Sequence, residues 1–288
     1  MIHRFVFGAF LILSCATWAE SQPRPEHNLD FSEPAMVWDE AHPLGNGLLG
    51  ALVWGDGRPL KISLDRTDLW DLRPVPQYES DDYSYERMRQ WVKEGRIEDL
   101  HRLYDDPYRN PGPTKIPAGR IELGLGDRPV FERAELDLST AVSRVRFDTG
   151  TAVEVRVHAV RPVGLIEVAS AGEVTPRLVV PAFAGTVEGP AARNEIVDGS
   201  ELASLGYVAP EVSGGDDWTG FLQEGWGGFR FAVALAWKRT GDRWTGAWGG
   251  GTAPENDDPH GPARRRGREA RGRDLTRPHA TRGAVGRG

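Results

Sequence analysis

Cysteine is almost absent from this chain. Its 288 residues include a single one, Cys15, so no disulfide can form within the chain. A Gly-x-Ser-x-Gly segment is also absent, and the serine nucleophile elbow that depends on it is therefore not indicated. His42, His101 and His158 show no spacing that gathers metal ligands. We therefore expect no zinc site and no cofactor.

Long apolar runs and an excess of positive charge are missing as well. The apolar run at residues 5–13 is too short to cross a bilayer, and no later stretch is long and apolar enough, so a membrane span is not expected. The 35 Lys and Arg are outnumbered by 42 Asp and Glu, which gives a formal charge of -7. Because phosphate backbones are bound by clustered cations, nucleic acid is not expected as a partner.

Tryptophan, in contrast, is abundant. The chain has ten, against three Met. The flat apolar ring of Trp, with its single donor, suits either the core of a sheet or a platform on which a sugar stacks. With 39% hydrophobic and 27% charged residues, the chain can bury one sizeable domain.

Residues 1–19 have the pattern of a secretory signal peptide. His3 and Arg4 supply positive charge, residues 5–13 are apolar, and residues 17–19 offer a cleavage site. We therefore expect an exported protein, either periplasmic or extracellular.

Cys15 leaves two interpretations of the export route. It follows Ile12, Leu13 and Ser14, which loosely resemble a bacterial lipobox, so it is a candidate for lipid anchoring. The alternative, which we favour, is that Cys15 is removed with the signal peptide.

The apolar pattern after residue 36 indicates short strands. Residues 48–54 and 60–64 flank a Gly-Asp-Gly turn and predict a hairpin. Residues 153–158 alternate between apolar and polar, with residues 142–147 as the expected partner strand. Further strands are expected at residues 164–168, 177–180 and 229–237. Because crossovers long enough for a parallel sheet are missing, the fold class is mainly β, a large antiparallel β-sandwich.

The hydrophobic period changes between residues 84 and 104. Apolar residues there recur at intervals of three and four, in two sets separated by Gly95. This spacing predicts a short two-helix insertion, broken at the glycine. Residues 106–117 contain four prolines and predict a loop.

Residues 249–288 differ in composition from the rest. From residue 262 onward there are nine Arg, no Lys and almost no large apolar side chain. Such a stretch cannot bury enough apolar surface to offset its ordering entropy, so we expect a disordered tail. One interpretation is an Arg-rich segment that binds nucleic acid or anionic lipid. The favoured one is a frameshift in GC-rich DNA, which predicts a longer intact gene product.

Two motifs carry a resemblance to a known family. Residues 37–55 read VWDEAHPLGNGLLGALVWG, similar to the W-x-E-A-x-P-L-G-N-G-x-L-G-A-x-V-x-G pattern that opens the N-terminal domain of glycoside hydrolase family 95. Residues 62–70, ISLDRTDLW, resemble that family's I-x-L-N-E-D-T-L-W. Residues 136–141, followed by the paired strands, resemble its strand-rich middle. Asp65 and Arg66 stand where many members have Asn and Glu, which indicates a divergent subfamily.

The resemblance to these α-L-fucosidase-like enzymes implies a fold and a function. It implies a β-sandwich domain at residues 30–248, a carbohydrate substrate, and a following α/α barrel that hydrolyses the glycosidic bond with inversion. No position of this chain matches the catalytic residues of that barrel, so none is assigned. The expected partner is thus a missing C-terminal catalytic domain. The alternative function is a stand-alone carbohydrate-binding β-sandwich.

Three residues are candidates for contact with carbohydrate: Asn46, Trp70 and Trp226. Asn46 lies between two glycines and could meet a ligand or the missing barrel, but such a segment also suits a turn that needs positive φ. Trp70 and Trp226 could stack on a sugar ring, although burial in the core is the favoured interpretation.

Four carboxylates lie near the same motifs: Glu40, Asp65, Asp68 and Asp71. Carboxylates in such a group could perform acid-base chemistry or bind a metal. We favour surface acids that pair with Arg66 and Arg73, because pairs of this kind are common.

Overall fold

The computed structural model describes residues 23–126, 129–183 and 202–253. The predicted signal peptide, Cys15 and residues 254–288 of the predicted tail lie outside these ranges. Within them the fold is mainly β with large antiparallel sheets, which confirms the predicted fold class.

The larger sheet has nine antiparallel strands. Their order is β1 (Leu29–Phe31), β8 (Phe131–Asp137), β9 (Val142–Phe147), β10 (Ala152–Val157), β11 (Val163–Ala169), β16 (Arg243–Ala253), β15 (Arg230–Thr240), β14 (Trp218–Glu224) and β13 (Glu211–Gly215). Strands β8 to β11 follow one another along the chain, so short hairpins build this half of the sheet.

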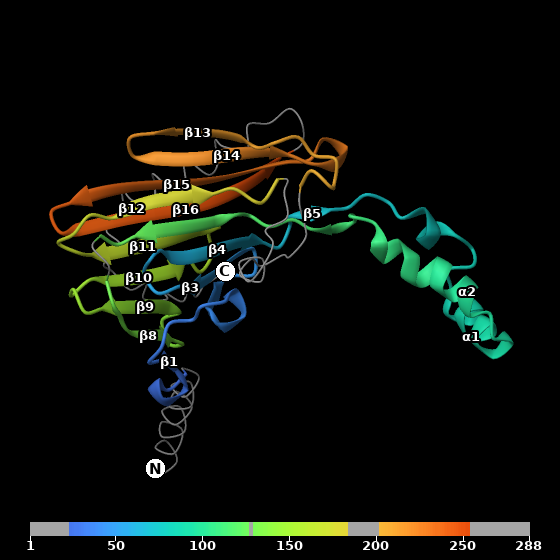
Figure 1. Cartoon of the computed structure of the whole chain (residues 1–288), viewed down its shortest axis with the longest axis horizontal. Helices are drawn as coiled ribbons and strands as arrows, with labels where there is room; N and C mark the ends of the chain where they lie inside the picture. Colours follow the sequence, from blue (N-terminus) through green and yellow to red (C-terminus); the bar gives the residue numbers. More distant parts are fainter. Residues whose placement is uncertain (1–22, 127–128, 184–201, 254–288) are drawn as a thin grey trace, which may run out of the picture.

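A second sheet of five antiparallel strands packs against the first. Its order is β12 (Thr175–Val179), β7 (Arg120–Gly124), β4 (Leu60–Arg66), β3 (Leu49–Trp54) and β2 (His42–Gly45). The predicted hairpin is present as β3 and β4, and the glycines at 55 and 57 both have positive φ. Figure 1 shows the two sheets as neighbouring layers.

The core lies between these layers. Its fully buried members come from both sheets and include Ile62, Ile121, Phe147, Ile166 and Trp248. Along β10 the alternating residues Val153 and Val155 point inward, as the period of two predicts.

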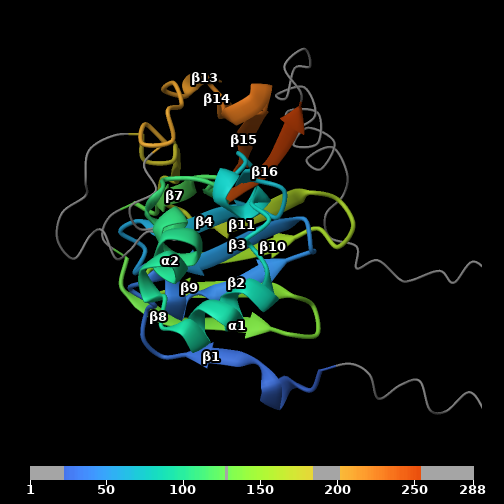
Figure 2. The same cartoon turned by 90° about the vertical axis from the view of Figure 1, so that its right-hand side faces the viewer.

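A helical segment projects from one side of the sheets (Figures 1 and 2). It leaves through β5 (Trp70–Asp71) and returns through β6 (Thr114–Lys115), which pair with each other. Its elements are η3 (Pro76–Glu79), α1 (Tyr85–Glu94), α2 (Ile97–Leu100), the π-helical turn η4 (His101–Asp105) and η5 (Asp106–Arg109). We call residues 72–113 the arm.

The predicted two-helix insertion is confirmed. The Ser84 side chain caps α1 by accepting from the Arg87 amide, and Gly95 ends the helix with a φ of 71°. The expected loop at 106–117 is less irregular than predicted, because it includes η5 and β6. Short 3₁₀ turns complete the fold: η1 (Pro25–His27), η2 (Trp38–Glu40) and η7 (Trp226–Gly228).

The predicted start of the polar tail was wrong by several residues. Strand β16 continues to Ala253, where it pairs with Arg230 of β15. Residues 249–253 were assigned to the tail because glycines offer little apolar surface. Their backbone hydrogen bonds to β15 hold them in the sheet instead. The lack of side chains also lets Arg66 approach, since a Cβ on Gly250 would lie 3.2 Å from its Cδ.

Candidate functional site

Most of the candidate residues gather where β4 and β5 leave the sheets. We call this region the arm base and define it by Asp65, Arg66, Asp68, Trp70, Asp71, Arg73, Lys115, Tyr207, Trp226 and Thr252. Strand β4 brings the first two residues to the edge of the core, and the β5–β6 pair brings the next ones to the root of the arm.

Trp70 lies on the surface of the arm base. Its side chain is 46% exposed, while the next residue, Asp71, is buried, as the alternation of a strand requires. The indole Nε1 donates to the Thr67 carbonyl at 3.0 Å, which fixes the ring. Lys115 Nζ lies 6.0 Å from the ring centroid. The favoured interpretation of Trp70 as a core residue was therefore wrong, and the ring remains available to a ligand.

Asp65 is paired with Lys115. The ammonium donates to the Asp65 carboxylate and to the Arg66 carbonyl, so it bridges β4 and β6. The Lys115 ammonium is thus near both the Asp65 carboxylate of β4 and the Trp70 ring.

Asp68 is held by Arg66 through two hydrogen bonds, of 2.8 and 2.6 Å. Arg66 itself is buried and also donates to the Gly250 carbonyl at 2.7 Å. Burial alone would raise the pKa of Asp68, but the hydrogen bonds and charge of Arg66 outweigh it and hold that pKa below its usual value.

Asp71 has the most enclosed carboxylate of the group. Arg73 donates to it at 2.9 and 2.6 Å, and the Tyr207 hydroxyl donates at 2.7 Å. Burial would raise the pKa of Asp71, yet these donors bring it below its usual value. Burial and the bond to Asp71 raise the pKa of Tyr207 in turn.

Trp226 belongs to the segment that packs against Tyr207. It opens η7 and is 47% exposed, so its expected place in the core was also wrong. The preceding Gly225 lies against Tyr207 so closely that a Cβ there would be 3.3 Å from the hydroxyl oxygen. Trp70 thus precedes Asp71 along the chain, and Trp226 follows the glycine that packs against Tyr207.

Asn46 is not part of the arm base. It lies in the turn between β2 and β3, beside Gly47, whose φ is 86°. Its amide nitrogen donates to the carbonyls of His158 and Arg161 at 2.8 and 2.9 Å. Its oxygen accepts from the amides of Leu48 and Leu49 at 3.0 and 2.8 Å. These four bonds use the donors and both acceptor positions of the side chain, which favours the turn interpretation.

The paired carboxylates limit what the arm base can do chemically. An inverting hydrolase needs one carboxylic acid that protonates the leaving oxygen. Asp68 and Asp71 are instead stabilised as anions, and Asp65 is paired with Lys115. The interpretation as salt-bridged acids therefore agrees with the contacts of these three. Glu40 lies elsewhere and accepts from the Met36 amide.

The described ranges hold no group of three metal-ligating side chains, and none of their helices has the length and apolar character needed to cross a bilayer. His42 lies between the sheets, and His158 accepts from the backbone of its own loop. The arm base therefore has two half-exposed aromatic rings, Trp70 and Trp226, and several paired charged side chains. Such a combination suits recognition of a polar ring-shaped ligand.

Sequence reasoning missed Lys115, Tyr207 and Thr252. Lys115 and Tyr207 lie 50 and 136 positions from the carboxylates they contact, and Thr252 lies 184 positions from Asp68. No local pattern indicates such pairings.

Comparison with known proteins identifies a related domain. Residues 29–169 match the family model described as "Glycosyl hydrolase family 65, N-terminal domain". This segment is similar to that N-terminal domain. The match to the family 65 domain ends with the last residue of β11, so it includes the arm, Asn46 and Trp70 but not Trp226. The assignment to family 95 is not confirmed by this match.

Two individual proteins are also similar. Alpha-L-fucosidase 2 of Arabidopsis thaliana is 27% identical over 139 residues, and the match covers 42% of this chain and 15% of that protein. The chain thus spans a small part of the length of this relative. A solved protein from the human microbiome, assigned as a kojibiose phosphorylase, has a TM-score of 0.35 at 10% identity, over 55% of this chain and 24% of the other. That likeness is too slight to support a conclusion.

Proposed function

We propose that this chain is the N-terminal, non-catalytic domain of an exported glycoside hydrolase that acts on oligo- or polysaccharides, with α-L-fucosides as the substrate class. The observation that carries the proposal is the match of residues 29–169 to a glycosyl hydrolase N-terminal domain. The similarity to an α-L-fucosidase and the family 95 motifs at residues 37–55 and 62–70 support the substrate class.

Catalysis belongs, in this proposal, to a domain outside the present sequence. The matched segment of this chain covers 15% of the similar α-L-fucosidase, and the resemblance to family 95 implies a following α/α barrel. Asp68 and Asp71 of the arm base are poor general acids, because hydrogen bonds from Arg66 and Arg73 hold the pKa of each carboxyl below its usual value. We therefore assign no catalytic residue to this chain.

Export is part of the same proposal. Residues 1–19 would direct the protein to the periplasm or the exterior, with Cys15 as an optional lipid anchor. Mass spectrometry of the mature N-terminus distinguishes cleavage before Glu20 from a lipidated Cys15.

Reading the genomic DNA through residues 249–288 and several hundred bases beyond tests the proposal. We expect a barrel-coding stretch in another reading frame. The purified chain is expected to release no sugar from α-L-fucosides. Robust hydrolysis by this chain alone, or an uninterrupted frame that ends at Gly288 without downstream coding, would refute the proposal.

A stand-alone carbohydrate-binding module is the second candidate, because Trp70 and Trp226 both present exposed rings at the arm base. In this case Trp70→Ala and Trp226→Ala should each weaken binding of a soluble α-L-fucosylated oligosaccharide by about tenfold or more, since a stacked aromatic ring supplies much of such affinity.

Isothermal titration calorimetry measures this loss. Val130→Ala serves as the control, because Val130 is exposed and lies beside Asp148, at the end of the larger sheet opposite the arm base. Absence of binding by the wild-type chain, or equal binding by all variants, excludes a binding role for these two tryptophans.

A further inference from the structure

The turn between β2 and β3 contains a chemically reactive pair of residues. Asn46 and Gly47 form the only Asn-Gly pair in the chain. In such a pair the backbone nitrogen of the glycine can attack the side-chain carbon of the asparagine, because no Cβ hinders its approach. Asparagine is accordingly among the thermolabile residues of proteins. The turn therefore contains a candidate site of spontaneous deamidation.

This reaction needs only water. The Gly47 nitrogen forms a bond to Cγ of Asn46, its proton passes to Nδ2, and the bond from Cγ to Nδ2 breaks as ammonia leaves. Water then opens the resulting succinimide ring. Cleavage of the new bond at Cγ gives aspartate, and cleavage of the original peptide bond gives isoaspartate. No oxidant or reductant takes part.

Solvent reaches the pair. Gly47 is exposed, and the space that a Cβ on this residue would occupy is open. Asn46 is partly buried. Because water can approach the turn, protection of the site depends on how the Asn46 side chain is held.

The folded protein holds the reacting amide group at both of its polar atoms. Nδ2 of Asn46 donates to the carbonyls of His158 and Arg161, and Oδ1 accepts from the amides of Leu48 and Leu49. Ring closure expels Nδ2 from between two carbonyl oxygens that lie 2.8 and 2.9 Å from it. The side chain must therefore leave these partners before Cγ reacts, so the rate follows the population of an opened turn.

The same hydrogen bonds join the two sheets. The β2–β3 turn belongs to the five-stranded sheet, whereas His158 and Arg161 lie in the loop between β10 and β11 of the nine-stranded sheet. Two backbone bonds close that loop, from the His158 amide to the Val163 carbonyl at 2.8 Å and from the Val163 amide to the Arg161 carbonyl at 2.7 Å. The Asn46 amide group thus fastens one sheet to the other.

A carboxylate at residue 46 cannot make this connection. It has no hydrogen to donate, so the carbonyls of His158 and Arg161 lose this donor and face an anion instead. The amides of Leu48 and Leu49 can still donate to the carboxylate. Deamidation therefore acts on the contact between the sheets and leaves the bonds within the turn in place.

We propose that Asn46 is a deamidation site that the folded chain protects, and that its conversion to a carboxylate detaches the β10–β11 loop from the β2–β3 turn. Because ammonia is lost, the change is irreversible, and it marks chains in which the turn has opened. Neither step depends on the proposed carbohydrate function.

Ageing of the full chain tests the protection. The wild-type protein is incubated at neutral pH, folded in buffer or unfolded in guanidinium chloride, and peptide mass spectrometry measures aspartate and isoaspartate at residue 46. We expect deamidation to be at least about tenfold slower in the folded chain. Equal rates would overturn the proposal. So would a faster rate in the folded chain, since the amides of Leu48 and Leu49 would then be assisting the attack by stabilising the developing oxyanion.

Substitution tests the consequence. Asn46→Asp places the deamidated side chain in the protein from the start. Hydrogen exchange at the amides of His158 and Val163 should be at least about tenfold faster than in the wild type, because the loop has lost its connection to the other sheet.

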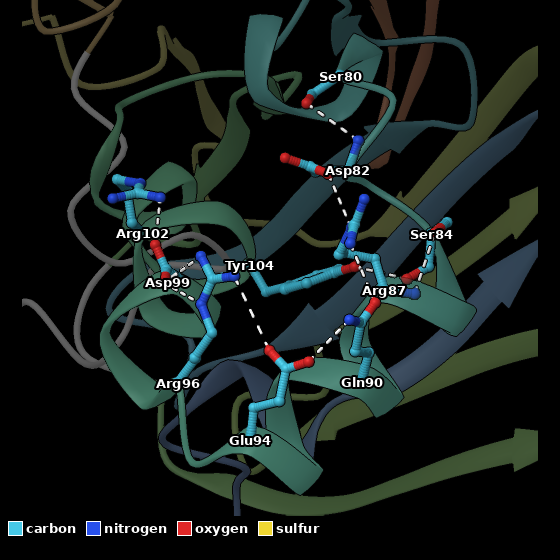
Figure 3. A network of polar contacts seen from close by, with 10 residues as sticks. All are labelled: Ser80, Asp82, Ser84, Arg87, Gln90, Glu94, Arg96, Asp99, Arg102 and Tyr104. Atoms are coloured by element: carbon cyan, nitrogen blue, oxygen red, sulfur yellow. Dashed lines mark hydrogen bonds and ion pairs between the residues drawn. The ribbon is translucent and has the colours of Figure 1, made fainter.

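Gln90→Glu is the matched control, because it makes the same change from amide to acid on the exposed surface of the arm. Figure 3 shows Gln90 bonded to Glu94, to which its Nε2 donates at 2.7 Å. This variant should leave exchange at the His158 and Val163 amides unchanged. Unchanged exchange in Asn46→Asp, or equal acceleration in both variants, would contradict the proposal.

The aged wild-type chain supplies the product if Asn46→Asp does not fold. Ion-exchange chromatography separates the deamidated fraction by its added negative charge. That fraction must show the faster exchange at the His158 and Val163 amides, and exchange equal to that of fresh protein would refute the link between Asn46 and the β10–β11 loop.

Discussion

Glycine and tryptophan meet across neighbouring strands of the larger sheet. Gly164 of β11 lies opposite Trp248 of β16, and a Cβ on Gly164 would come within 1.9 Å of the indole ring. Trp248 is fully buried there. Its burial thus depends on a residue without a side chain on the adjacent strand.

Replacing this glycine should therefore destabilise the fold. We expect Gly164→Ala to lower the free energy of unfolding by about 3 kcal/mol, because the indole cannot keep its position once a methyl group occupies the same space. Urea unfolding followed by Trp fluorescence measures the change. Gly172→Ala is the control, since its Cβ would meet only the Ser170 hydroxyl, at 3.5 Å. Equal stability of the two variants would contradict the account.

The number of tryptophans in the sequence does not predict which of them are buried. Trp54, Trp91, Trp244 and Trp248 are buried, whereas Trp70 and Trp226 are half exposed. Flanking residues did not distinguish these two sets, because burial depends on which strand or helix packs opposite each ring.

At the scale of elements, the β5–β6 pair fixes the arm to the β domain. The pair has two residues in each strand, so its backbone bonds alone are few. The buried Asp71 supplements them by accepting from Arg73 within the arm and from Tyr207 of a distant segment. This carboxylate therefore links three parts of the chain.

Removing the charge of Asp71 should weaken the junction between the arm and the two sheets. Asp71→Asn is expected to reduce the free energy of unfolding by about 3 kcal/mol, because Arg73 loses its ionic partner in a largely buried site. Chemical denaturation provides the measurement. Asp30→Asn, which removes an exposed pair with Arg133, should change stability by no more than about 1 kcal/mol. A similar small effect of Asp71→Asn would show that the junction does not depend on the ion pair.

Several elements with a clear period were predicted, whereas the alternating strands β7 and β8 and the elements rich in glycine were not. The hairpin β3–β4, the strands β9 to β11 and the helices α1 and α2 follow from alternation or from spacing of three and four. The hairpin β13–β14 and the whole of β16 were missed. Gly214 and Gly215 in the hairpin and Gly249 to Gly251 in β16 carry no apolar pattern. Backbone pairing with a neighbouring strand is what orders them.

At the scale of the whole molecule, His42 joins the two sheets. Its ring lies in β2, stacks on Phe31 of β1 and bonds through Nδ1 to the Ser143 hydroxyl of β9 at 2.9 Å. Within the described ranges its Nε2 is buried without a hydrogen-bond partner. Burial lowers the pKa of His42 to about 4, so the ring stays neutral in the folded protein at neutral pH.

The folded protein should consequently lose stability in mild acid. The unfolded chain binds a proton at His42 below about pH 6.5, whereas the folded chain binds it only near pH 4. The contribution of neutral His42 to the free energy of unfolding is therefore complete above pH 6.5. It falls by roughly 3 kcal/mol as the pH approaches 4. The ionised carboxylates of Asp68 and Asp71 also stabilise the fold, because their pKa values are depressed. That stabilisation is lost only at a lower pH than the contribution of His42.

Urea unfolding at pH 7 and at pH 4.5 measures the effect. The His42→Gln variant keeps an uncharged polar side chain at this position and should show a much smaller difference between the two pH values. An identical difference in the wild type and in the variant would assign the acid sensitivity to other groups.

The sequence by itself determined the fold class, the two-helix insertion and the resemblance to a glycoside hydrolase N-terminal domain. These depend on local periods and on contiguous motifs, which a single chain displays directly. Only the tertiary structure decided which tryptophans are exposed, that Asp71 meets Tyr207, and that the arm stands apart from the sheets. Those properties arise from pairing between distant segments, and side-chain chemistry along the chain does not specify such partners.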